Sequence, residues 1–132
     1  MLQRPIAVGL TLCRLAVVEE RTHNVSLINS FTSIKAASIP GTLEPFYACA
    51  LLTDGMGIAE VVLTVTQLET MEEVYSQRWQ GHFSHPLQRL WLLFPIRECP
   101  VPALGRYQVT LNMDSDGIAE SVFEVVAKGQ ES

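Results

Sequence analysis

The stretch of sequence that decides the fold is YQVTLNMDSDGIAESVFEV, which runs from Tyr107 to Val125. In its first half, apolar side chains at positions 107, 109, 111 and 113 alternate with polar ones. A period of two is typical of a β-strand with one buried face and one face in water. Asp116-Gly117 then gives a turn signal, and apolar residues resume at Ile118. The stretch therefore predicts two strands joined by a tight turn.

The same pattern occurs a second time in the chain, at an offset of 60 residues. Residues 54–65 and 114–125 agree at seven of twelve positions, including the Asp, the Gly and the Ile-Ala-Glu that follows it. In both copies the alternation places one set of apolar side chains on one face and the glutamate, Glu60 or Glu120, on the other. We therefore expect two similar β-hairpins, in which the Asp and Gly provide the turn geometry.

The acidic residues of these two turns leave a second interpretation open. Asp54 with Glu60, and Asp114 with Asp116 and Glu120, can offer carboxylate oxygens to a hard cation such as calcium. Calcium takes about six to eight oxygen ligands, and two or three carboxylates in a turn do not supply them. The turn role is favoured, and we predict no metal site.

Period-two runs separated by turn residues continue through the rest of the chain. Turn signals include Gly81, Pro86 and Asp54-Gly55, where Gly supplies a positive φ and Pro removes a ladder donor. Within residues 67–75, a capping-box pattern over good helix formers allows one short helical turn. We expect about eight strands, near Ile6–Val18, Val25–Thr32, Phe46–Thr53, Ile58–Thr66, Val74–Gln80, Leu87–Phe94, Tyr107–Met113 and Ile118–Val126.

Length and charge limit the classes of protein to consider. The 132 residues are enough for one domain, with residues 128–132 expected to fray. Nine basic and fourteen acidic residues give a net charge of −5, which repels phosphate backbones and anionic lipid. No uncharged apolar run approaches the ~20 residues that cross a bilayer. We therefore predict neither a nucleic-acid partner nor a membrane partner.

Cysteines and histidines are the first candidates for chemistry. Three widely spaced cysteines fit neither a disulfide framework nor a metal knuckle, and they favour the reducing cytoplasm. Cys13 and Cys49 lie in apolar strand segments, whereas Cys99 lies in a connection and is the best candidate for a reactive thiol. His82 and His85 lack a third and a fourth metal ligand nearby, so a polar turn is favoured there.

Sequence patterns of common enzymes and cofactor sites are absent. The chain has no GxSxG turn, no GxxxxGK[ST] loop and no strand-GxGxxG-helix unit. We predict no catalytic residue and no cofactor, and therefore a protein that is not an enzyme. An enzyme would need a pocket that joins Cys99 to a histidine and a carboxylate.

Three stretches of the chain resemble a bacterial family of small β-sandwich proteins that is classified as a domain of unknown function. They are the apolar opening strand with Cys13, residues 24–31 with Ile34, and residues 99–111. The last stretch, CPVPALGRYQVTL, is similar to the Pro-x-Gly-x-Tyr-x-Val-x-Leu segment of many immunoglobulin-like sandwiches. The resemblance implies a single immunoglobulin-like antiparallel β-sandwich over residues 1–132, and it offers no catalytic residue.

Aromatic and apolar residues in the second half of the chain are the remaining feature. The segment 90–94 is apolar on both strand faces, so it is either covered on both sides or offers one face to a partner. We take Trp79, Trp91 and Leu93 as the candidate interaction surface. The predicted function is a non-enzymatic interaction or scaffold module that binds a protein partner or a second copy through a sheet face or edge. The alternative is a sandwich that binds a carbohydrate or lipid-like molecule through Trp79 or Trp91.

Overall fold

The computed structural model describes residues 5–85, 88–114 and 116–128, and within them the regular structure consists of strands, with no helix. All eight predicted strands are present at or close to their expected positions. The strands are β1 (Ile6–Val18), β2 (Val25–Ser30), β3 (Ser33–Ala36), β4 (Gly41–Thr42), β5 (Phe46–Thr53), β6 (Gly57–Gln67), β7 (Glu72–Phe83), β8 (Leu90–Ile96), β9 (Pro100–Val101), β10 (Gly105–Met113) and β11 (Asp116–Ala127).

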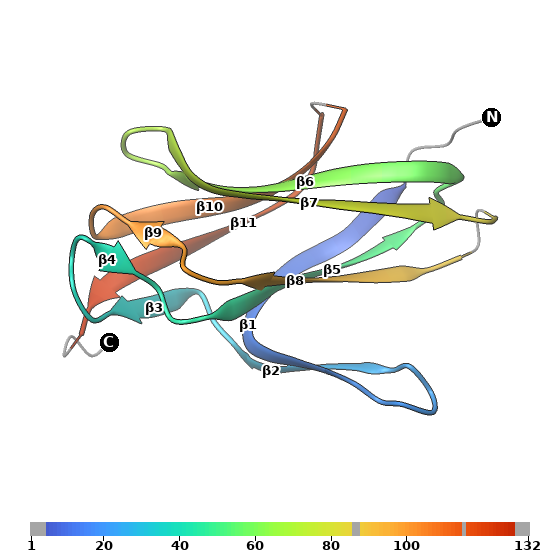
Figure 1. The fold of residues 1–132 in the computed structure, drawn as a ribbon, viewed down its shortest axis with the longest axis horizontal. Coiled ribbons are helices and arrows are strands. Elements are labelled where there is room, and N and C mark those ends of the chain that lie inside the picture. The colour runs from blue at the N-terminus through green and yellow to red at the C-terminus, as the bar shows by residue number, and fades with distance from the viewer. Residues whose placement is uncertain (1–4, 86–87, 115, 129–132) are drawn as a thin grey trace.

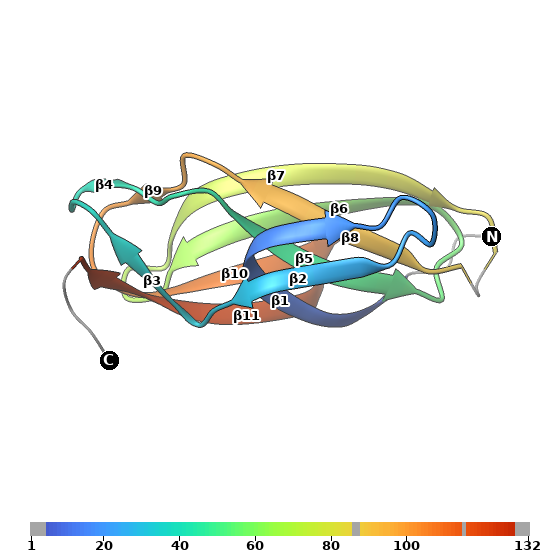
Figure 2. The same cartoon turned by 90° about the horizontal axis from the view of Figure 1, so that it is seen from below.

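Two stacked sheets form the predicted β-sandwich, as Figures 1 and 2 show. One sheet has the order β2-β1-β5-β8, and the other has the order β3-β11-β10-β6-β7. A small third sheet joins β4 to β9 at one end. Every pair is antiparallel except β3 with β11, which run parallel. That exception makes the five-stranded sheet mixed.

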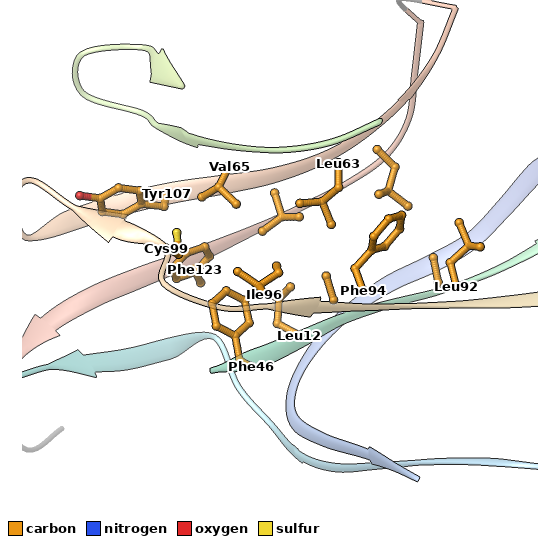
Figure 3. Close-up of a cluster of buried hydrophobic side chains, with 14 of the residues drawn as sticks. Leu12, Phe46, Leu63, Val65, Leu92, Phe94, Ile96, Cys99, Tyr107 and Phe123 are labelled. Carbon is orange, nitrogen blue, oxygen red and sulfur yellow. The ribbon is translucent and has the colours of Figure 1, made fainter. Parts of the chain in front are cut away.

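The core lies between the two sheets because side chains alternate along each strand. In β6, Val61, Leu63 and Val65 are fully buried, whereas Glu60 faces solvent. In β8, the even-numbered residues 92, 94 and 96 are buried. Figure 3 shows how these side chains meet those of β10 and β11 in one cluster. The predicted faces of β6 and β11 are thus confirmed.

Four aromatic rings pack together at one end of the core. Phe123 of β11 contacts Phe31, Phe46 and Tyr107, with ring centroids 6.4, 5.8 and 5.7 Å away. Phe31 also meets Phe46 edge-on at 5.4 Å. Because these rings come from both sheets and from the segment between β2 and β3, they join distant parts of the chain.

Tyr107 also fixes the connection that leads into β10. Its ring is buried, its hydroxyl donates to the carbonyl oxygen of Ala103 at 2.6 Å, and the Ala103 N–H lies 3.3 Å from the same hydroxyl. This arrangement is similar to the tyrosine corner of immunoglobulin-like sandwiches, in which a tyrosine hydroxyl bonds to the backbone a few residues upstream. This geometry fits the fold expected from residues 99–111.

Tyr107→Phe should lower the free energy of unfolding by about 0.5–1.5 kcal/mol, because the partly buried backbone groups of Ala103 lose their partner. Urea denaturation at neutral pH measures this. Tyr47→Phe is the matched control, since the Tyr47 hydroxyl makes no hydrogen bond within the described residues. An equal effect in both variants would show that the corner hydrogen bonds contribute nothing specific.

The two copies of the repeated pattern adopt different structures, so the expectation of two similar hairpins is wrong. β10 and β11 do form a hairpin. In the first copy, however, β5 belongs to one sheet and β6 to the other, so residues 54–56 cross between the sheets. Gly55 allows this crossing because a Cβ there would lie 2.8 Å from the ring of Phe83. The Asp of each copy has a positive φ, 63° for Asp54 and 51° for Asp114, as a turn role requires.

The helical turn allowed within residues 67–75 does not form. Residues 68–71 make a tight turn in which the Met71 N–H donates to the carbonyl oxygen of Gln67 at 2.7 Å. Glu72 then enters the ladder opposite Gln67, and its N–H donates to Thr70 Oγ1 at 3.2 Å. Strand pairing therefore outcompetes the local helix preference of these residues.

Gly81 was expected to end a strand, but it lies within β7. A Cβ on Gly81 would lie 2.2 Å from the Trp79 ring, so the glycine leaves space for the indole. Sequence reasoning also missed three short strands, β3, β4 and β9. The predicted strand Val25–Thr32 ends at Ser30, where Asn29 has a φ of 56° and the chain changes sheets. Pro86, Leu87 and residues 129–132 of the expected tail lie outside the described residues.

Candidate functional site

Trp91 and Leu93 lie on the side of β8 that faces away from the core. Their neighbours at 92 and 94 are buried between the sheets, so the alternation turns Trp91 and Leu93 outward. The register places Leu51 of β5 opposite Trp91, and Val8 of β1 opposite Leu51. Trp91 is 42% exposed and Val8 is 56% exposed. Three adjacent strands thus present one apolar row to solvent.

The rows on either side of this one carry further apolar side chains. Leu93 is opposite Cys49, and Pro95 is opposite Tyr47. At the other end, Ile6 pairs with Thr53 and is 54% exposed. We call this surface the outer apolar face, defined by Ile6, Val8, Tyr47, Leu51, Trp91, Leu93 and Pro95. It covers the three strands β1, β5 and β8.

A two-stranded ribbon extends from this sheet. The first part of β1 pairs with β5 and the last part pairs with β2, and the two pairings meet at Cys13. Figures 1 and 2 show that the ribbon lies on the outer side of β5 and β8. Leu15 is opposite Ile28 on this ribbon, and the two are 46% and 42% exposed. The ribbon therefore adds apolar side chains beside the outer apolar face.

Trp79 lies elsewhere. It is in β7 opposite the fully buried Val61, so it is on the inner side of the other sheet, and it packs against the core. Its indole also covers Gly81. The structure thus brings two of the three predicted surface residues together, and it gives Trp79 a place at the edge of the core.

Ile6, Val8 and Leu51 were not predicted as surface residues. The signal that could have found them is the same one that marked residues 90–94. The run 6–18 is apolar at odd and even positions alike, and so is the segment 48–52. Three apolar strands of this kind that pair with one another leave an apolar outer face unless a further layer covers it.

All three cysteines are free and buried. Cys13 and Cys49 sulfurs lie 3.8 Å apart on adjacent strands. Burial, together with a smaller contribution from the neighbouring Cys13, raises the pKa of Cys49 to about 12. Burial also raises the pKa of Cys99 to about 12. Cys99 is therefore buried among core residues, where its neutral form is favoured, and this fits a structural role better than that of a reactive thiol.

Metal-ligating residues do not gather in the described part of the chain. Neither the histidines nor the acidic turns belong there to a group of three or more His, Cys, Asp or Glu residues that could hold a metal ion. His82 is exposed opposite Ile58 in β7, and His85 is exposed beyond the end of that strand.

The outer apolar face is therefore the candidate site, because it is an apolar surface that is partly open to solvent. No helix in residues 5–85, 88–114 and 116–128 is long and apolar enough to cross a membrane. A comparison with models of known protein families and with curated proteins finds no match for the chain.

Proposed function

We propose that the chain is a non-enzymatic interaction module that binds a protein partner through the outer apolar face. The observation that carries this proposal is the row Val8, Leu51 and Trp91, which is apolar across three paired strands and partly open to solvent. Contiguous apolar surface on a folded domain is a common mark of an interaction site. Tryptophan and tyrosine are enriched in such interfaces, and this face contains Trp91 and Tyr47.

The open edge of β8 supports the same proposal. Among the described strands, β8 pairs with β5 alone, so its other edge carries unpaired backbone groups. An exposed apolar edge strand readily accepts a strand from another chain. A partner that adds a strand to β8 would also extend over Trp91 and Leu93.

The positions of the tryptophans give less support to the alternative, a small-ligand site built on aromatic stacking. Trp79 and Trp91 belong to different sheets, and one faces the core while the other faces outward. They do not form a shared stacking surface. Three unpaired cysteines continue to favour a reducing compartment, and we propose the cytoplasm.

The double variant Val8→Thr with Trp91→Thr should weaken partner binding at least tenfold, since both side chains contribute apolar area at the centre of the face. Threonine keeps the strand preference of both positions. The measurement is retention of proteins from a native lysate, together with sedimentation velocity at protein concentrations up to about 100 μM. At that concentration, self-association with a Kd of up to about 100 μM is still partly populated.

Ile58→Thr with Val122→Thr is the matched control, because these side chains are 59% and 42% exposed but lie outside the outer apolar face. Binding that this control retains and the first variant loses supports the proposal. A monomer whose lysate contacts are the same in all three proteins would overturn it.

A further inference from the structure

A cavity of about 810 Å³ opens where the β1–β2 ribbon leaves the sandwich, and it is distinct from the outer apolar face. Its lining comes from four separate segments of the chain and includes Arg14, Lys35, Lys128, Glu44, Phe31 and Ile34. Sites for small ligands typically have volumes of about 300–1,000 Å³. The cavity is therefore large enough for a small organic molecule.

The charge of the lining is opposite to that of the chain. Three of the nine basic residues line this cavity, against one of the fourteen acidic residues. Arg14 pairs with that acid, Glu44, at 2.5 Å. Lys35 and Lys128 make no ion pair within the described residues. Two uncompensated ammonium groups thus border one cavity in a protein of net charge −5.

Backbone hydrogen bonds hold these cations near one another. β3 runs parallel to β11, with Lys35 opposite Val126, and the Lys128 N–H donates to the carbonyl oxygen of Ala36 at 3.1 Å. The two lysines therefore lie at neighbouring strand ends. Arg14 comes from β1, at the point where its pairing passes from β5 to β2.

The cavity also has a firm apolar part. Phe31 donates its backbone N–H to the carbonyl oxygen of Leu12 at 3.0 Å, and its ring packs edge-on against Phe46 and Phe123. Ile34 belongs to the buried core. A ligand at this site would border the ring of Phe31 as well as the two lysines.

We propose that this cavity binds a small organic anion, in which a phosphate or carboxylate is attached to an apolar group. Lys35 and Lys128 attract the anionic group, because an anion there offsets two unpaired positive charges. Phe31 contacts the apolar group. This activity is separate from partner binding at the outer apolar face, so either one can fail without the other.

Phenyl phosphate is the probe for this site, and uncharged benzyl alcohol is its comparison ligand. We expect binding of phenyl phosphate by calorimetry, with amide chemical-shift changes centred on residues 30–35 and 42. Lys35→Gln with Lys128→Gln should weaken binding at least tenfold. Arg21→Gln with Arg97→Gln removes the same charge from exposed positions outside the cavity lining and should leave binding within twofold.

Glu44→Gln provides a test in the opposite direction. It removes the carboxylate that pairs with Arg14, so phenyl phosphate should bind severalfold more tightly. Benzoate in the same titrations shows whether the site accepts carboxylates as well as phosphates. Equal binding of benzyl alcohol, equal losses in the two charge variants, shifts centred elsewhere, or no binding at 20 mM probe would each overturn the proposal.

Discussion

Phe123→Ala should lower the free energy of unfolding by about 3–5 kcal/mol, the cost of truncating a large buried aromatic side chain. The ring is buried and contacts Phe31, Phe46 and Tyr107 at one end of the core. Each aromatic pair adds about 0.5–1.5 kcal/mol beyond the area it buries. Domains of this size have about 5–15 kcal/mol of total stability, so a large share would be lost. Urea denaturation measures the difference.

Two further variants make this result interpretable. Phe123→Leu keeps most of the volume and should cost less than the alanine change, because the cavity that remains is smaller. Val122→Ala lies next to it on the same strand but points outward and is 42% exposed, so it should change stability by no more than about 0.5 kcal/mol. A loss below about 1 kcal/mol for Phe123→Ala would contradict the aromatic cluster as a centre of stability.

Alkaline pH should destabilise the protein from about pH 9 upward, with the thiols of Cys49 and Cys99 as the main cause. Burial raises the pKa of each to about 12 from an ordinary value of 9.0. Between these values the unfolded chain loses thiol protons that the folded chain keeps, so stability falls as pH rises. At pH 10.5 the loss is about 2 kcal/mol for each thiol, because one pKa unit corresponds to about 1.4 kcal/mol.

The change in the free energy of unfolding with pH separates the effect of thiol titration from the effect of lost packing. Cys49→Ala and Cys99→Ala each leave a small cavity, but that cost is the same at pH 8 and at pH 10.5. Each variant should therefore show a smaller decrease between these pH values than the wild type, with a phosphine reductant present. Tyr75 and Tyr107, whose pKa values burial also raises, still contribute in both variants. An unchanged slope would show that neither thiol titrates differently on folding.

Much of this fold could be predicted because apolar and polar residues alternate along its long strands. β10 and β11 are hydrogen-bonded along most of their length, and their inward residues are those that the alternation selects. The helical turn allowed within residues 67–75 does not form because Glu72 pairs with Gln67 in the sheet. A local capping pattern carries no information about such strand pairing. β4 and β9 have two residues each, too short for any periodicity to show.

The candidate site was predicted in part for a related reason. Trp91 and Leu93 were found because one short segment is apolar at every position. Which of its faces is open depends on the register with β5, and Val8 joins the same row only through pairing across β5. The location of Trp79 on the inner side of the other sheet depends equally on register. The internal repeat did not predict the local fold either, because its two copies, which share an Asp and a Gly in the turn, form a crossing between sheets and a hairpin.

The parallel pairing of β3 with β11 sets the order in which the protein can fold during synthesis. Ala36 is paired with Ala127, so the edge of the five-stranded sheet cannot close until the ribosome has added the intervening residues. At about 5–20 residues per second, that interval is roughly 5–20 s. β1, β2 and β5 can pair with one another well before then, while the strands of the other layer are still being made. A sheet that forms from these three strands during that interval would have no second layer over its inner apolar side chains.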